Sequence, residues 1–251
     1  MRSQFRFVSF SASMIALLLF VAATLVASAQ TSSERSTAPS DAAWAKIYAT
    51  DCGAAMKHPC PPSTNGYENE FTGDPRFAPL LTRSLPQRES WWVNGYGGVA
   101  PVSSIVQEFI GVPKDLLLDD DRYVTATGCV PHDCLTTGML WINTETKPAT
   151  VIFVGEDLVA GGQKGESGYH LYLYTSREIT TYYAGKRHIE MFAPQFLKSL
   201  ARWHDAAISQ YDDQKIILVT IVWPNGATHD IFWSDLLKPS IPTTTNPGAN
   251  Q

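Results

Sequence analysis

Two strand-like runs enclose a short cysteine-bounded segment in residues 122–143, which read RYVTATGCVPHDCLTTGMLWIN. Residues 122–128 and 137–143 are rich in β-branched and aromatic side chains, which favour strands. The segment between them holds a proline and polar residues that are typical of a turn. We therefore expect a β-hairpin whose tip is a loop made of Cys129, Val130, Pro131, His132, Asp133 and Cys134.

Runs of similar composition on both sides of this hairpin indicate an antiparallel meander. Further strands are predicted at residues 104–111, 149–155 and 169–175. The three aspartates at residues 119–121 are expected in a solvated turn between strands. A late hairpin is predicted at residues 214–233, because Asn225-Gly226 tolerates the positive φ of a tight turn.

Helices are expected around this meander. Asp41 and Asp74 can cap helices over residues 41–49 and 74–84, and apolar residues recur at helical spacing from Pro194 onward. The strands cluster and no βαβ alternation is evident. The predicted fold class is therefore α+β, an antiparallel β-sheet meander with flanking helices and an extension in the C-terminal half.

The first 29 residues have the parts of a secretory signal peptide. Arg2 and Arg6 give a positive start, residues 14–26 are almost wholly apolar, and residues 27–29 read Ala-Ser-Ala, a cleavage signal. The apolar run is shorter than the roughly 20 residues that span a bilayer as a helix. We expect a cleaved signal, a chain that starts at Gln30, a periplasmic location and no stable membrane insertion.

The composition limits the class of protein. The chain has 251 residues, of which 44% are hydrophobic and 17% charged, so it can bury a sizeable core. Loss of the signal peptide lowers the formal net charge from −5 to about −7. This acidic balance argues against nucleic acid and anionic membranes as partners, and it permits a cationic partner.

The four cysteines matter because an even count in an exported chain suggests two bridges. If Cys129 and Cys134 are oxidised, the ring that they close contributes only about 2 kcal/mol by the chain-entropy estimate. A better reason for such a ring is that it holds a loop side chain ready for a binding partner. A rigid loop loses less conformational entropy when it binds. The side chain held outward would be that of His132 or Asp133.

Other uses of the loop residues are less consistent with the sequence. A metal site of Cys129, His132 and Cys134 lacks a distant fourth ligand, and export favours oxidation of the cysteines. A cysteine nucleophile paired with His132 would need two neighbours in one small ring to adopt a reactive geometry. The glutamates and the other histidines form no acid/base or ligand motif. We therefore expect neither an enzyme nor a metal or other cofactor, and a purely structural stapled hairpin remains the alternative to a binding loop.

The loop resembles that of the inhibitor of vertebrate lysozyme (Ivy) family of periplasmic bacterial inhibitors. Its Cys-x-Pro-His-Asp-Cys pattern follows Tyr123-Val124 and precedes Met139-Leu140-Trp141. The resemblance extends upstream through Leu85-Pro86, Trp92-Val93 and Gly97-Gly98 and covers roughly residues 74–155.

The resemblance implies an Ivy-like domain whose disulfide-closed loop enters the active-site cleft of c-type lysozyme. The histidine carried over is His132, which would hydrogen-bond the catalytic carboxylates, and Asp133 would fix the loop or the imidazole tautomer. The bridge would join Cys129 and Cys134. Val130 departs from the family, in which a charged residue, often lysine, follows the first loop cysteine. The implied partner is c-type lysozyme or another peptidoglycan glycan hydrolase, and a homodimer is possible because family members can dimerise.

The resemblance also suggests a division of the chain. Cys52 and Cys60 suggest a second bridge in an N-terminal segment. The parts expected are a signal peptide at 1–29, a disulfide-stapled segment at 30–72, an Ivy-like core at 73–158, a divergent C-terminal part of the same domain at 159–240 and a disordered tail at 241–251.

Two alternative functions remain open in the sequence. The chain can be an inhibitor or immunity protein for a bacterial muramidase or a lytic transglycosylase, because those enzymes also use a catalytic carboxylate in a glycan cleft. It can also be a peptidoglycan-binding module, because residues 91–98 combine aromatic rings, an amide and glycines, a mixture that stacks on sugars. In the competing interpretation, Trp92 and Tyr96 simply pack on the sheet.

Overall fold

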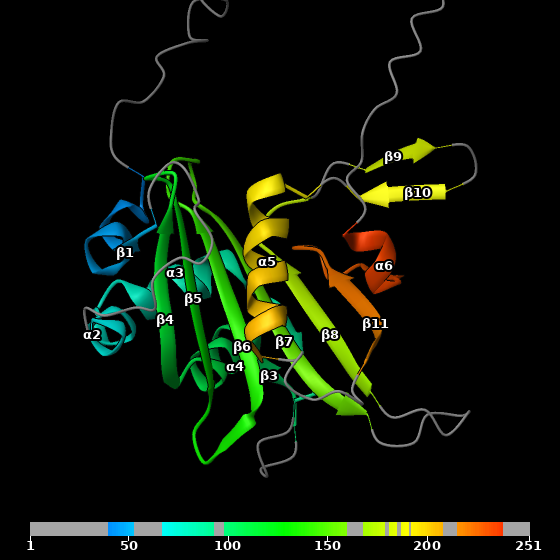
Figure 1. The fold of residues 1–251 in the computed structure, drawn as a ribbon, viewed down its shortest axis with the longest axis horizontal. Coiled ribbons are helices and arrows are strands. Elements are labelled where there is room, and N and C mark those ends of the chain that lie inside the picture. The colour runs from blue at the N-terminus through cyan, green and yellow to red at the C-terminus, as the bar shows by residue number, and fades with distance from the viewer. Residues whose placement is uncertain are drawn as a thin grey trace, which may run out of the picture. The chain divides into compact units, whose positions relative to one another are not determined.

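The computed structural model describes residues 40–52, 67–92, 98–159, 168–178, 181–184, 187–190, 192–207 and 215–237. At the centre of this part of the chain is a mixed eight-stranded sheet with the order β1-β4-β5-β6-β7-β8-β11-β12 (Figure 1). Helices accompany the sheet, so the α+β fold class is confirmed. The expected signal peptide, Cys60 and the polar tail lie outside the described residues, and the Cys52–Cys60 bridge stays a prediction.

The large sheet and two small two-stranded sheets contain all the strands of the described residues. The strands of the large sheet are β1 (Thr50–Asp51), β4 (Val112–Asp119), β5 (Tyr123–Val130), β6 (Asp133–Asn143), β7 (Thr150–Val159), β8 (Gly168–Thr175), β11 (Lys215–Val222) and β12 (Thr228–Ile231). The small sheets pair β2 (Arg88–Glu89) with β3 (Ala100–Pro101), and β9 (Thr181–Ala184) with β10 (Arg187–Glu190). The helices are η1 (Ala43–Tyr48), α2 (Glu68–Gly73), α3 (Phe77–Ser84), α4 (Val102–Phe109), α5 (Pro194–Ala207) and α6 (Trp233–Leu236).

The predicted meander is present from β5 to β8, and β4, which was not predicted, takes the place of its first strand. Each strand from β4 to β8 pairs antiparallel with the next one along the chain. The late hairpin of β11 and β12 is also confirmed. The pairs β1–β4 and β8–β11 are parallel, so the sheet is mixed. Helix α5 lies in the chain between the parallel strands β8 and β11, a single crossover that the sequence did not indicate.

The two faces of the sheet bury two separate cores. Successive strand residues point to opposite faces, and β6 shows this clearly. Leu140 and Ile142 pack in the core beneath α3 and α4, whereas Met139 and Trp141 pack in the core beneath α5. Figure 1 shows α5 crossing one face of the central strands. Both faces of the central strands are therefore covered, which explains their nearly continuous apolar sequences.

Residues 104–111 do not form the predicted strand, because Val102–Phe109 is the helix α4. The β-branched residues suggested a strand, but the buried side chains Val102, Ile105, Val106 and Phe109 recur at the spacing of one helix face. Packing of that face on β5, β6 and β7 overrides the local strand preference. This helix lies directly before β4 and so leads the chain toward the loop end of the sheet.

The turn predicted at residues 119–121 lies one residue later, at residues 120–122. Asp119 ends strand β4, is 1% exposed and accepts two hydrogen bonds from Arg202 of α5 at 3.2 and 2.9 Å. Asp120 and Asp121 make the turn itself, with φ of 53° and 47°. Strand β4 was missed by the sequence analysis, because its three leucines are preceded by a proline and two charged residues.

The cap predicted at Asp41 is wrong, and the helix predicted to follow Asp74 begins later than expected. Asp41 does not cap η1, because its Oδ1 accepts a hydrogen bond from the Ala149 amide at 3.0 Å. The Asp74 carboxylate accepts hydrogen bonds from the backbone amide and the guanidinium of Arg76, and α3 begins only at Phe77. Only Asp41 therefore takes a distant partner, whereas the contact of Asp74 is local.

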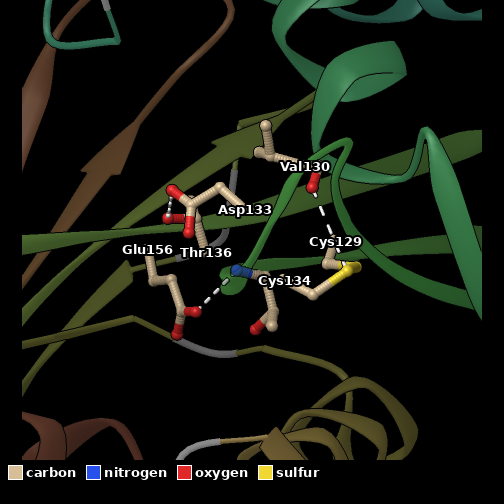
Figure 2. Close-up of a disulfide and its surroundings, with 7 residues drawn as sticks. Cys129, Val130, Asp133, Cys134, Thr136 and Glu156 are labelled. Carbon is tan, nitrogen blue, oxygen red and sulfur yellow. Dashed lines mark hydrogen bonds between the residues drawn. A yellow bond between two sulfur atoms is a disulfide. The ribbon is translucent and has the colours of Figure 1, made fainter.

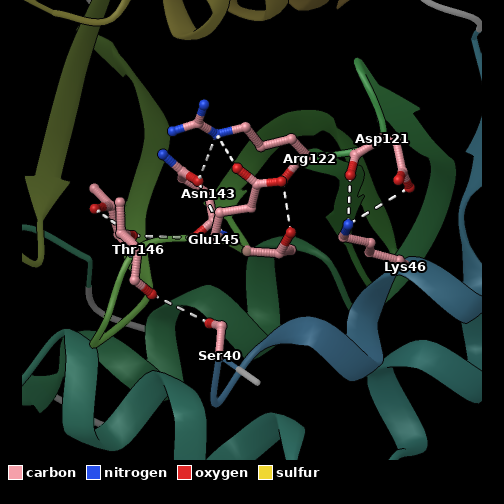
Figure 3. A network of polar contacts seen from close by, with 9 residues as sticks. Ser40, Lys46, Asp121, Arg122, Asn143, Glu145 and Thr146 are labelled. Carbon is pink, nitrogen blue, oxygen red and sulfur yellow. Dashed lines mark hydrogen bonds and ion pairs between the residues drawn. The ribbon is translucent and has the colours of Figure 1, made fainter. Parts of the chain in front are cut away.

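The end of the β5–β6 hairpin opposite the loop is held by polar contacts, which Figure 3 shows. Arg122 donates to the Asn143 side chain at 3.2 Å and forms an ion pair with Glu145 at 3.2 Å. Ser40 donates to the carbonyl of Thr146 at 3.2 Å. The N-terminal segment is thereby attached to the turn that follows β6.

A buried hydroxyl pair joins α5 to the sheet and gives a first prediction. Thr125 donates to Ser199 at 3.1 Å, and both residues are buried. Replacement of Ser199→Ala leaves the Thr125 hydroxyl without its acceptor, so the free energy of unfolding should fall by about 1–2 kcal/mol in urea titrations. The double change Thr125→Val with Ser199→Ala removes both polar groups and should be less destabilising. A single variant as stable as the unchanged protein would contradict this account.

Candidate functional site

The loop predicted at the tip of the hairpin is present and is closed by a disulfide. Cys129 and Cys134 are bonded, with their Cα atoms 4.8 Å apart (Figure 2). Strand β5 ends at Val130 and β6 begins at Asp133, and these two residues are paired across the hairpin. Neither sulfur is a thiolate in this state, so these cysteines cannot act as metal ligands or as a nucleophile.

The disulfide has one end in the core and one end at the surface. Cys129 is fully buried, and Val130 is buried in the core beneath α3 and α4. Residues 131–135 are exposed. Val130 therefore anchors the loop through its apolar side chain.

His132 occupies the apex in a left-handed backbone conformation, with φ of 68°. Few residues other than glycine adopt this region, and histidine, asparagine and aspartate are among those that do. Pro131 on one side and the disulfide around the turn restrict the backbone further. The combination presents an exposed imidazole on a backbone with little freedom.

Asp133 contacts the loop itself. Its carboxylate accepts a hydrogen bond from the Thr136 hydroxyl at 2.9 Å (Figure 2). This contact spans the exposed start of β6 and stabilises the return of the chain from the apex. Asp133 therefore stabilises the loop through this hydrogen bond.

Glycines bring α4 and β4 close to the base of the hairpin. A Cβ atom added at Gly128 would lie 2.7 Å from the Ile110 Cα, and one added at Gly138 would lie 2.9 Å from the Phe109 Cβ. Any side chain at these two positions would push the hairpin away from its neighbours. The base of the loop is therefore packed against the end of α4.

The sequence analysis did not identify Glu156 of β7, which lies beneath the loop. Its side chain is 2% exposed, and its Oε1 accepts a hydrogen bond from the Thr137 amide of β6 at 2.6 Å (Figure 2). Burial raises the pKa of Glu156 from 4.5 to about 7, although the hydrogen bond from the Thr137 amide and the charge of Lys114 oppose the rise. Its other oxygen has no hydrogen-bond partner among the described residues.

Apolar side chains are exposed near the loop. Leu135 directly follows the disulfide and is 63% exposed, and Val112, the register partner of Cys129, is 41% exposed. We call these two residues the apolar rim. In the sequence, Leu135 can be recognised as an apolar residue beside the polar residues of the tip.

The tryptophans proposed as a sugar platform make contacts within the fold. Trp91 stacks on Tyr172 with ring centroids 4.3 Å apart and planes at 9°, and its Nε1 donates to the Tyr174 hydroxyl. The Trp92 Nε1 donates to Glu108 of α4 at 2.8 Å. Both indoles therefore serve to attach this segment to the sheet and to α4, while residues 93–97 lie outside the described part of the chain.

A second polar group lies on β8, β11 and β12. Thr220 donates to Asp230 at 2.6 Å, so its oxygen accepts from the Nε2 of His170 at 2.7 Å. Burial lowers the pKa of His170, which favours the neutral ring. Since the Thr220 proton is directed at Asp230, His170 does not act as a base toward this hydroxyl. This histidine is a partly buried residue within a hydrogen-bond chain, as its isolation in the sequence suggested.

Comparison with protein-family models, with curated proteins and with solved structures found no match for this chain. No helix within the described residues is long and apolar enough to cross a membrane.

Proposed function

We propose that the protein is a periplasmic inhibitor of c-type lysozyme with an Ivy-like fold, and that its loop of residues 129–134 enters the active-site cleft of the target. The observation that carries this proposal is the disulfide-closed hairpin tip with an exposed His132 at its apex. A disulfide is compatible with export to an oxidising compartment. The chain would then act by binding and would carry out no chemistry of its own.

The shape of the loop supports insertion into a cleft. The apex is exposed, while Cys129 and Val130 anchor the ring in the core, so the tip projects from a rigid base. A tip that is ordered before binding loses little conformational entropy in the complex. Such preorganisation is typical of tight protein inhibitors of enzymes.

The chemistry of His132 suits a cleft with two carboxyl groups. Retaining glycosidases use one protonated and one ionised carboxyl group, about 5–5.5 Å apart. A neutral imidazole donates from one nitrogen and accepts at the other, so it can bond an ionised carboxylate and a protonated carboxyl group together. The loop backbone would meanwhile exclude the glycan from the cleft.

The apolar rim supplies a prediction for the contact around the cleft. Leu135→Asp should weaken lysozyme inhibition by about tenfold, because a buried apolar contact at a protein interface is commonly worth about 1–2 kcal/mol. Ile47→Asp is the matched control, since Ile47 is 69% exposed and lies on η1, outside the rim. Inhibition constants measured in parallel should separate the two variants. Equal inhibition by both variants would show that the rim is outside the interface.

A panel of enzymes tests the proposed function. The chain from Gln30 is added to a c-type lysozyme, a lytic transglycosylase and an unrelated muramidase, and hydrolysis of peptidoglycan is followed. We expect inhibition of the c-type lysozyme. Inhibition of the lytic transglycosylase alone would reassign the target while keeping the loop mechanism, and full activity of all three enzymes would refute the proposal.

A further inference from the structure

The β6–β7 ladder ends just below the loop, at the pair of Gly138 and Gly155. Beyond this pair β6 no longer pairs with β7 and runs back to the disulfide, while β7 continues along β8. The next amide of β6, that of Thr137, therefore donates its hydrogen bond to a side chain of β7 instead of a backbone carbonyl. Glu156 supplies that acceptor at 2.6 Å. This hydrogen bond links β7 to the base of the loop.

The carboxyl group of Glu156 is held in surroundings that disfavour its charge. It is 2% exposed, and its Oε2 is buried without a hydrogen-bond partner. Lys114 of β4 and Asp133 of β6 are the charged groups that act on it, and they have opposite effects on its pKa. Burial outweighs both and raises the pKa to about 7.

We propose that Glu156 is a positioning residue for the loop: its neutral carboxyl group keeps the base of the hairpin closed, and its ionised form favours opening toward water. The consequence for lysozyme rests on the proposed function, because only the closed base would hold His132 ready for binding. The opening itself is a property of this chain alone. A buried, unpaired carboxylate gains hydration when the base opens, which a neutral group does not need.

The direction of the pH dependence follows from proton linkage. The closed form binds the Glu156 proton more tightly than an open, hydrated form, in which the pKa would be near 4.5. Closure is therefore fully favoured below about pH 4.5, and the closed-to-open ratio falls about tenfold per pH unit up to about pH 7. Above that pH the ratio is constant at its lower level.

Hydrogen exchange of the Thr137 amide measures this opening directly. Protection factors, corrected for intrinsic exchange, are recorded by NMR between about pH 5 and pH 8 for the unchanged protein, Glu156→Gln and Glu145→Gln. We expect protection in the unchanged protein to fall by about 100-fold over this range. The closed-to-open ratio falls about tenfold per pH unit up to about pH 7 and is then constant. Glu156→Gln keeps an acceptor without a charge, so its protection should be independent of pH. Glu145 lies at the opposite end of the hairpin, and its variant should follow the unchanged protein.

Three results would overturn the assignment: constant protection in the unchanged protein, a fall of equal size in Glu156→Gln, or a flat profile in Glu145→Gln. If Glu156→Gln does not fold, the carboxyl ¹³C shift of Glu156 in the unchanged protein decides. A midpoint near 7 supports the proposal, and a midpoint near 4.5 contradicts it. None of these readouts needs lysozyme, so failure to inhibit lysozyme would refute the proposed function and leave the role of Glu156 standing.

Discussion

His132→Asn is expected to raise the inhibition constant for c-type lysozyme by about 30- to 1000-fold, the range that corresponds to a central interface residue worth about 2–4 kcal/mol. The imidazole is the exposed group at the apex of the loop, and it is the group that would bond both carboxyl groups of the cleft. The measurement is the inhibition constant from steady-state hydrolysis of peptidoglycan. Thermal unfolding of the variant should be nearly unchanged.

Asparagine is the informative replacement because of the backbone at this position. His132 has a φ of 68°, a region in which alanine is strained and asparagine is well tolerated. An alanine variant would combine the loss of the imidazole with a change in loop geometry. His204→Asn serves as the control, since His204 lies on α5 and stacks on Trp233, away from the loop. If His132→Asn inhibits as well as the unchanged protein, the imidazole has no part in binding.

Removal of the disulfide by Cys129→Ala with Cys134→Ser should weaken inhibition by about 10- to 100-fold. Alanine is chosen at Cys129 because this residue is fully buried and a hydroxyl there would lack a partner. The loss of ring closure should lower the free energy of unfolding by only about 2 kcal/mol, because the closed loop is short. Most of the effect on binding would come from the freedom that the apex regains.

The comparison of stability with inhibition makes this second prediction specific. Urea unfolding should remain cooperative, and the far-ultraviolet circular dichroism should be unchanged, while the inhibition constant rises. The unchanged protein treated with dithiothreitol should behave like the variant. Full inhibition by a reduced and well-folded protein would show that ring closure is not needed for recognition.

The parts of the fold that were predicted correctly are those with local signals. The strands on either side of the loop and the ring of Cys129 to Cys134 are encoded within 22 consecutive residues. Helix α5 and the late hairpin also carry their own periodicity and turn residues. Such elements depend little on the rest of the chain, because propensity and pattern agree within one segment.

The features that were missed depend on distant partners. The strand predicted at residues 104–111 became helix α4 because its apolar face packs on the sheet, and Asp119 is buried because Arg202 neutralises it from α5. Glu156 follows Gly155 and precedes Asp157, so the sequence there resembles the polar end of a strand. Its burial results from the packing of β6 and β8 beside it, which no local pattern indicates.

The structure of the complex with c-type lysozyme is the most direct test of the central claim. We expect the loop closed by Cys129 and Cys134 to lie in the active-site cleft, with His132 nitrogens about 2.7–3.2 Å from oxygens of both catalytic carboxyl groups. The rim residue Leu135 should be buried against the edge of the cleft. A complex in which the loop remains in solvent, or a cleft occupied by another part of this chain, would contradict the account.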